Sequence, residues 1–406
     1  MIETNFIDTE IGKVPADWAV VSLDSLFDFG NGYTPSKAIA NYWVNGTIPW
    51  FRMEDIRLNG RILSDSIQHI TPEAVKGGGL FPANSIILST TATIGEHALI
   101  TVDSLANQRF TFLMRKVKRE NDIDLMFFFH YCFLLGEWCR ANINDGGLMA
   151  VNMKDLKSCM LPLPPLPEQR RIASALSSID NLISALDKLI EKKCAIKTGA
   201  MQELLGGKRR VKGCEGEWKS VRLGEGLIFQ CGAPFESSYF NTESIGMRLI
   251  KNRDLKSDDQ VYFYSGEYSD EYIVRNGDLL VGMDGDFLPC IWNKGEALLN
   301  QRVGRIKSDI WSIPFLYYIL MEPLKIKQAG TGATTVKHLS HGDIESMSIL
   351  LPSSLEEQRA IASVLTAMDD ELAALEAKKA KYVALKQGMM QQLLTGKIRL
   401  IDSFAK

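Results

Sequence analysis

The stretch PPLPEQRRIASALSSIDNLISAL, residues 164–186, recurs in altered form as SSLEEQRAIASVLTAMDDELAAL, residues 353–375. The similarity continues beyond both stretches, because residues 168–210 align with residues 357–399 without a gap. Roughly half of the aligned positions are identical, which is far beyond chance for an ungapped match. An internal repeat with so long a period predicts a duplicated architecture.

Each copy of the repeat is predicted to form one long helix. Ser354 and Glu357 fit a capping box at the start of the second copy. The first copy begins with prolines, which a helix tolerates in its first turn. Gly206–Gly207 and Thr395–Gly396 supply the two ends. A helix of ~37 residues between these signals would be about 55 Å long.

Apolar side chains in both copies follow the 3.5-residue repeat of a coiled-coil seam. The predicted helix-pair interface consists of Ile172, Leu176, Ile179, Ile183, Leu186 and Ile190 in the first copy and Ile361, Leu365, Met368, Leu372 and Leu375 in the second. We therefore expect the two helices to pack on each other. The alternative is that each helix packs only on its own globular region, although the repeat would then drift toward 3.6 residues.

Two strand-rich regions alternate with the helices and resemble each other more faintly. NGYTPSK at Asn31 corresponds to CGAPFES at Cys231, FPANSIILS at Phe81 to VRNGDLLVG at Val274, and NQR occurs at Asn107 and Asn300. An apolar helix is predicted after each NQR, near 125–135 and 313–321. The predicted domains are residues 1–160, the long helix 161–211, residues 212–350 and the long helix 351–406.

Composition excludes several classes of protein. The net charge of −3 is mild evidence against a compact nucleic-acid-binding protein, although charge can be local. The seven cysteines form no Cys-x-x-Cys pair, so neither a zinc ribbon nor a disulfide framework is indicated. With no leader segment and no apolar run near the ~20 residues of a membrane span, we expect a cytoplasmic protein that does not enter a membrane.

Catalytic motifs are not found in the sequence. It contains no Gly-rich phosphate loop, no Asn/Asp-Pro-Pro-Tyr motif for methyl transfer and no Gly-x-Ser-x-Gly elbow. His338 and His341 have the spacing of a helical metal pair, but capping or solvent-facing roles are favoured. Asp284 and Asp286 in MDGDF could serve a metal-dependent nuclease, but a turn between strands is favoured. We therefore predict no catalytic residue, no metal site and no cofactor in this chain.

Polar and basic side chains on Gly-flanked loops are candidates for contacts to DNA. Arg and Lys are suited to guanine, and Asn and Gln to adenine. The candidates are Tyr33, Thr34, Ser36, Lys37, Arg52, Thr91, Thr93, Gln108 and Arg109 in the first region, and Lys251, Asn252, Arg253, Gln301, Arg302, Thr334, Thr335 and Lys337 in the second. Their recurrence at similar places in two copies supports the group more than any single residue.

The two copies of the helix motif resemble a known family. LPLPPLPEQRRIASALSSID, followed by MQELLGGKRR, is similar to the central conserved region of the specificity subunit of type I restriction–modification systems, and LPSSLEEQRAIASVLTAMD with MQQLLTGKIRL is similar to the distal one. GKVPADW, GNGYTPSK, IPWFRMEDI and GMDGDF resemble segments of its target-recognition domains. The resemblance implies an α+β fold, in which two pseudo-repeated mixed α/β target-recognition domains are separated by two long antiparallel coiled-coil helices with pseudo-two-fold symmetry.

The resemblance also implies a non-catalytic function. Each domain would recognise one half of a split site in double-stranded DNA, and the helix pair would fix the spacer length. Two methyltransferase subunits with S-adenosylmethionine would bind the chain, and two restriction subunits using ATP and Mg²⁺ can join them. The second globular region lacks IPWF and TPS in recognisable form. The alternatives are a coiled-coil scaffold with two protein-binding domains and no role on DNA, and a stand-alone nuclease using Asp284 and Asp286.

Overall fold

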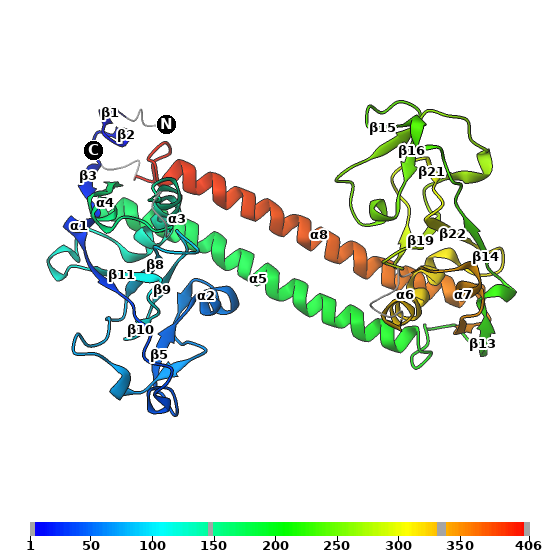
Figure 1. Cartoon of the computed structure of the whole chain (residues 1–406), viewed down its shortest axis with the longest axis horizontal. Coiled ribbons are helices and arrows are strands. Elements are labelled where there is room, and N and C mark those ends of the chain that lie inside the picture. The colour runs from blue at the N-terminus through cyan, green and yellow to red at the C-terminus, as the bar shows by residue number, and fades with distance from the viewer. Residues whose placement is uncertain (1–4, 145–148, 331–337, 402–406) are drawn as a thin grey trace. The chain divides into compact units, whose positions relative to one another are not determined.

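The computed structural model describes residues 5–144, 149–330 and 338–401 (Figure 1). The chain divides into a first unit, residues 1–186 with 378–406, and a second unit, residues 187–377. Both predicted helices are present as α5 (Leu166–Leu204) and α8 (Leu355–Leu393), and each contributes to both units.

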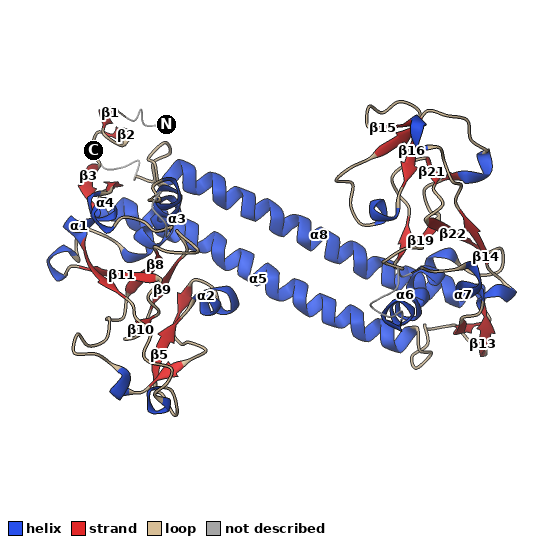
Figure 2. Ribbon diagram, in the orientation of Figure 1, coloured by secondary structure: helices blue, strands red, loops and turns tan. Residues whose placement is uncertain are grey.

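The first unit contains a five-stranded and a three-stranded sheet, two short strand pairs and a largely buried helix, and Figure 2 shows the strands and helices. The larger sheet has the order β4 (Phe27–Asn31), β11 (Phe110–Arg115), β8 (Ser85–Ser89), β9 (His97–Ile100) and β6 (Ile62–Leu63). The smaller has the order β10 (Leu105–Ala106), β5 (Ile48–Phe51) and β7 (His69–Ile70). The remaining elements are β1 (Phe6–Thr9), β2 (Gly12–Pro15), β3 (Ala19–Ser22), β12 (Met160–Leu163), α1 (Leu23–Leu26), α2 (Met53–Asn59), α3 (Leu125–Ala141) and α4 (Met153–Ser158).

The second unit repeats this plan. One sheet has the order β14 (Ile228–Cys231), β22 (Val303–Lys307), β19 (Leu279–Gly282) and β20 (Pro289–Ile291). The other has the order β15 (Phe240–Asn241), β17 (Tyr262–Tyr264), β16 (Met247–Ile250), β21 (Ala297–Leu299) and β18 (Ile273–Val274). β13 (Trp218–Arg222), β23 (Ser348–Pro352), α6 (Ile313–Gly330) and α7 (His341–Glu345) complete it.

A short antiparallel strand pair leads into each long helix. β3 pairs with β12 directly before α5, and β13 pairs with β23 directly before α8. The apolar helices predicted near 125–135 and 313–321 are α3 and α6, which lie in the cores of their units. The corresponding segments FPANSIILS and VRNGDLLVG contain the fully buried strands β8 and β19.

A counterpart of IPWF exists in the second unit, although the sequence does not reveal it. β5 lies parallel to β10, and β16 lies parallel to β21. The Asp55 carboxylate accepts a hydrogen bond from the backbone N–H of Arg52 at 2.6 Å, and Asp254 accepts one from Lys251 at 2.7 Å. Both aspartates are buried. The motif is hidden because the turn requires only the aspartate, whereas many apolar residues suit the strand.

The end signals of the long helices act as predicted, with one exception at the start of α8. Gly207 and Gly396 have φ of +67° and +71°, the left-handed conformation of a helix C-terminus. Ser354 Oγ accepts a hydrogen bond from Glu357 N at 3.4 Å, which is half of the predicted capping box. The other half is not formed, because the Glu357 carboxylate binds Arg210 instead.

Two histidines in the first unit are almost completely buried, which makes this unit sensitive to acid. His97 and His130 are 1% and 0% exposed. Burial lowers the pKa of His97 to about 3 and that of His130 to about 4, because the charged imidazolium loses its hydration. The unfolded chain would bind these protons near the ordinary value of 6.5. The contribution of the two neutral histidines to the stability of the first unit is therefore complete above pH 6.5, and it is lost as the pH falls toward 4.

We expect the melting temperature of the first unit to fall steeply between pH 6.5 and pH 4. His97→Leu should flatten this dependence, since the ring contacts Phe129 and Phe133 and needs no charge there. Thermal unfolding followed at a series of pH values tests the expectation. His341→Leu is the control, because His341 is exposed on the second unit. If the melting temperature of His97→Leu depended on pH as that of the wild type does, buried His97 would not be a cause of the acid sensitivity.

Candidate nucleic-acid interface

Three loops meet in the first unit, and three equivalent loops meet in the second. In the first unit, Thr90 N donates to Arg109 O at 3.0 Å, and Val151 N donates to Thr90 O at 2.9 Å. In the second unit, Met283 N donates to Arg302 O at 3.0 Å, and Leu339 N donates to Met283 O at 2.8 Å. The loops that follow β8 and β19, those that precede β11 and β22, and the segments before α4 and α7 therefore occupy equivalent places.

A fourth loop joins the other three through a glycine in each unit. A Cβ atom on Gly32 would lie 2.3 Å from the carbonyl oxygen of Asn107, and one on Gly232 would lie 2.3 Å from that of Asn300. Only glycine allows so close a backbone approach. This contact explains why NGYTPSK and CGAPFES correspond, and it places both segments beside the NQR loops.

The predicted contact residues of the first unit are partly exposed and partly structural. Ser36, Lys37, Gln108 and Arg109 are exposed, and Thr91 and Thr93 are half-buried. The Thr34 hydroxyl donates to the Gln108 side chain. The Tyr33 hydroxyl accepts a hydrogen bond from Lys76 N at 2.8 Å, and Arg52 pairs with Glu54 at 2.9 Å. The loops thus bring the side chains of Thr34 and Gln108 together, whereas the Tyr33 hydroxyl serves the fold.

In the second unit the side chains of Lys251, Asn252 and Arg253 contact neighbouring segments of the same unit. The Lys251 ammonium lies 3.1 Å from the centre of the Tyr262 ring, and partial burial lowers its pKa. The side chain of Asn252 donates to the carbonyl oxygen of Asp284. Arg253 donates to Gln260 O at 3.3 Å. Gln301 is exposed, whereas Thr334, Thr335 and Lys337 lie outside the described residues.

Asp284 and His338 lie on the same loops of the candidate interface, although neither was predicted as a contact residue. Asp284 Oδ2 lies 2.9 Å from Arg302 Nη1, and Asp284 Oδ1 lies 2.8 Å from His338 Nδ1. The signals in the sequence were MDGDF, which we interpreted as a turn between strands, and HLSH, whose histidines we assigned to capping or solvent-facing roles. His341 instead pairs with Glu345 at 3.1 Å, so the two histidines do not act together. Within residues 5–144, 149–330 and 338–401, no group of three or more His, Cys, Asp or Glu side chains could hold a metal ion.

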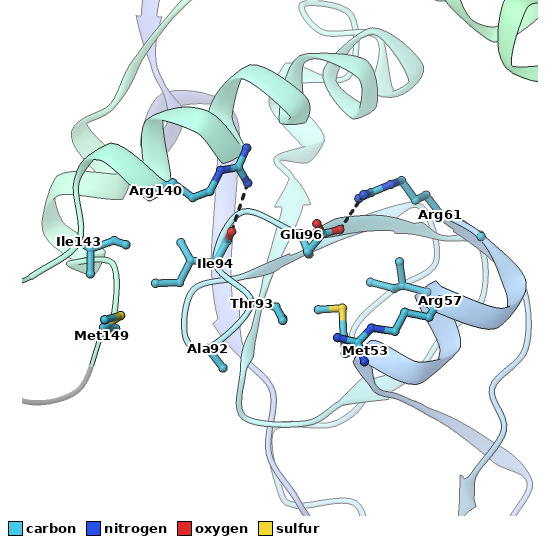
Figure 3. A pocket seen from close by; sticks show the side chains of 12 residues that line it. Met53, Arg57, Arg61, Ala92, Thr93, Ile94, Glu96, Arg140, Ile143 and Met149 are labelled. Carbon is cyan, nitrogen blue, oxygen red and sulfur yellow. Dashed lines mark hydrogen bonds and ion pairs between the residues drawn. The ribbon is translucent and has the colours of Figure 1, made fainter. Parts of the chain in front are cut away.

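A pocket of about 670 Å³ lies beside the interface of the first unit (Figure 3). Its apolar wall includes Met53, Ile94 and Met149. Arg140 donates to the carbonyl oxygen of Ile94 at 3.3 Å, which holds the loop that contains Thr93. The pocket is an apolar hollow with arginines around it and no paired carboxylates, so it offers binding rather than acid–base chemistry.

The segments of α5 and α8 run antiparallel within each unit, and repeated charge pairs join them. In the first unit Glu168 pairs with Arg399 at 2.8 Å, and Asp180 pairs with Lys386 at 2.6 Å. In the second unit the equivalent pairs are Glu357 with Arg210 at 2.5 Å, and Asp369 with Lys197. Each pair joins residues that are identical between the two copies, which explains these identities.

Gln169 and Gln358 also make equivalent contacts. Gln169 accepts from Asp124 N at 2.8 Å and donates to Pro164 O at 2.7 Å. Gln358 accepts from Ser312 N at 2.9 Å and donates to Pro352 O at 2.9 Å. Each glutamine therefore fastens the start of its long helix to the globular part of its unit.

The predicted seam is most deeply buried where it enters the globular cores and at Leu186, which is not part of either core. Ile172, Leu176, Leu186, Ile361 and Leu365 are 0–5% exposed. The other seam residues are half-buried, namely Ile179, Ile183, Ile190, Met368, Leu372 and Leu375. Ile172 and Leu176 belong to one hydrophobic core, which also contains Leu393 of α8 and the buried apolar residues of the globular part of the first unit. The helix ends therefore pack both on the other long helix and on a globular region, so the alternative in which each helix packs only on its own globular region is wrong.

These features define a class of protein with two duplicated units, each of which carries a polar loop surface and a pair of antiparallel helix segments. The model of the family described as "Type I restriction modification DNA specificity domain" matches residues 15–193 and again residues 215–384. The chain belongs to this family. The double match also confirms the duplication that the repeat predicted.

Relatives and solved structures agree with this assignment. The chain is 47% identical over 188 residues to the type I restriction enzyme EcoprrI specificity subunit of Escherichia coli, a match that spans 46% of each chain. It is 26% identical over 427 residues to the MjaVIII specificity subunit of Methanocaldococcus jannaschii, covering 98% of this chain and 97% of the relative. The S subunit structure from M. genitalium shares the fold, with a TM-score of 0.61 at 14% identity and 97% coverage of both chains.

Two further predictions are settled by these findings. The curated relatives are named specificity subunits, so the chain is the specificity component of such a system and not the catalytic one. The predicted fold class is confirmed by the S subunit neighbour. In the described part of the chain, no helix is both long enough and apolar enough to cross a membrane.

Proposed function

We propose that each unit recognises one half of a split site in double-stranded DNA, and that α5 and α8 set the spacer between the halves. The observation that carries the proposal is the recurrence of the same loop surface in both units, with Gln108 and Arg109 in the first and Gln301 and Arg302 in the second. All four side chains are exposed, and the loops that carry them are held in place by backbone hydrogen bonds. Exposed polar side chains retained in two diverged copies support a shared binding role.

The partners follow from the same proposal. Two methyltransferase subunits that carry S-adenosylmethionine would dock on this chain, and two restriction subunits that use ATP and Mg²⁺ can join them. The long helices offer a surface for docking, because Leu189 and Ile196, seven residues apart on α5, are 38% and 47% exposed. Residues at this spacing lie on one face of a helix. All seven cysteines are free, which suits the reducing cytoplasm that the sequence predicted.

A genome-wide map of adenine methylation tests the proposal. Cells would express the partner methyltransferase with and without this chain. A split motif that appears only with the chain is the expected result, and it gives both half-sites and the spacer at once. An unchanged map, with the methyltransferase shown to be active and bound, would instead favour a scaffold whose two domains bind proteins. DNA binding by the complex should also weaken steeply with salt.

Arg52→Ala is expected to relax recognition of the first half-site only. Arg52 begins α2, and its guanidinium lies 5.9 Å from the centre of the Trp50 ring. An arginine that contacts a base contributes ~1–3 kcal/mol of discrimination. Lys251→Ala is the matched variant, because Lys251 has the equivalent position in the second unit and should affect only the second half-site. Uniform weakening on all DNA sequences would assign both residues to phosphate contacts.

A further inference from the structure

The two units share an arginine but differ at two other equivalent positions of the loop surface. Thr91 forms a backbone bridge with Ala150 in the first unit, and Asp284 forms the same bridge with His338 in the second. Arg109 and Arg302 each supply the carbonyl oxygen that accepts from the neighbouring loop. The same backbone thus presents Thr, Arg and Ala in one unit and Asp, Arg and His in the other.

In the second unit these three side chains form a connected group. The carboxylate of Asp284 uses one oxygen for Arg302 Nη1, at 2.9 Å, and the other for His338 Nδ1, at 2.8 Å. In the first unit, the side chain of Arg109 has no hydrogen bond or ion pair with any other residue that the structure describes. One arginine is therefore held by a carboxylate, and its counterpart is not.

The contact between Asp284 and Arg302 is too exposed to be explained by stability. The Arg302 side chain is 54% exposed and that of Asp284 is 27% exposed. Ion pairs this open to water contribute little to folding. Moreover, the contribution of Arg302 to the fold comes from its backbone carbonyl, which Arg109 supplies equally well in the first unit.

The carboxylate of Asp284 also indicates which part of the DNA this surface would face. It would be repelled by phosphate, so its presence on a DNA-binding surface favours a position over the base edges rather than along the backbone. Asp284 occupies only one end of the planar Arg302 guanidinium, which leaves other N–H groups free to donate. Arginine recognises guanine by donating two parallel hydrogen bonds to O6 and N7, and a guanidinium held in place loses less entropy on binding.

We propose that Arg302 recognises a guanine in the second half-site and that Asp284 is its positioning residue. The inference rests on the proposed function, since it names the base-recognising group of one domain. It also distinguishes the two domains. Arg109, which has no such carboxylate, is expected to give weaker discrimination at the equivalent place in the first half-site.

The test is DNA binding and methylation by the assembled methyltransferase complex, with every base pair of both half-sites substituted in turn. Arg302→Ala is expected to reduce discrimination at one G·C pair of the second half-site by about 5- to 150-fold. Asp284→Asn, which keeps the shape but not the charge, should reduce discrimination at the same pair by a smaller factor. Neither variant should alter the first half-site. Arg109→Ala is the matched control and should leave the second half-site unchanged.

Three results would overturn the assignment. Equal weakening on all sequences, with a shallower salt dependence, would place Arg302 on a phosphate. A lower melting temperature of either variant, with unchanged discrimination among second half-sites, would show that Asp284 and Arg302 stabilise the fold and do not recognise a base. Full discrimination by Arg302→Ala at every pair of the second half-site would remove Arg302 from base recognition. A wild-type complex that methylates no split motif would instead overturn the proposed function, and the present inference with it.

Discussion

Leu365→Asp is expected to unfold much of the second unit and to abolish methylation at the split motif. Leu365 is 0% exposed and lies in a core that also contains Ile361 and Phe315. A buried carboxylate without a partner costs several kcal/mol, and the lost side-chain packing adds about 2–5 kcal/mol. Leu176→Asp should have the same effect on the first unit, since Leu176 is also 0% exposed.

Thermal unfolding of each variant, followed by the methylation map, measures these effects. Val364→Asp is the matched control, because Val364 is adjacent on α8 but 38% exposed. It should leave the stability of the second unit nearly unchanged. If the Leu176 and Leu365 variants still directed methylation to the unchanged site, the paired-helix arrangement would not be what sets the spacer.

Glu168→Ala is expected to destabilise the first unit by less than the ~3–5 kcal/mol that follows when a buried charge loses its only partner, because Arg399 keeps an ion pair with Asp17 at 2.6 Å. Glu168 is 2% exposed. It accepts hydrogen bonds from Trp18 Nε1 at 3.0 Å, from Arg399 Nε and Nη2 at 2.8 Å, and from Leu400 N at 3.1 Å. The bond with Glu168 is the main reason that the pKa of Arg399 is raised. Without Glu168, Trp18 Nε1 and Leu400 N lose their acceptor.

Glu357→Ala is the matched variant in the second unit, and it should cost less. Glu357 is equally buried, but its partner Arg210 is 34% exposed and can be hydrated. Nε1 of Trp218, the counterpart of Trp18, has no hydrogen-bond partner within the described residues. Urea unfolding with a probe in each unit measures the difference. A smaller loss for Glu168→Ala than for Glu357→Ala would mean that the extra hydrogen bonds of Glu168 contribute no net stability.

The helix repeat could be predicted because its residues interact in the same way in both units. Glu168 and Glu357, Asp180 and Asp369, and Gln169 and Gln358 each make equivalent contacts. Identical contacts preserve identical residues, so the duplication is visible in the sequence. The glycines that end both helices are retained for the same reason, since a left-handed residue is required at each.

The candidate interface was only partly predictable. The equivalence of Gln108 and Arg109 to Gln301 and Arg302 could be predicted because the NQR motif occurs twice. Tyr33 was selected by residue type, but its hydroxyl is used within the fold. The role of a polar side chain on a loop depends on what lies opposite it, which residue type alone does not reveal.

By itself, the sequence determined the duplicated order of domains and helices, the helix ends and the family to which the chain belongs. These are properties of local patterns and of residues that are repeated along the chain. Only the tertiary structure decided that Asp284, Arg302 and His338 form one group, since they lie on three separate loops and their pairing requires the sheet to bring the loops together. It also decided how deeply each part of the helix seam is buried, because burial depends on the globular cores beside the helices.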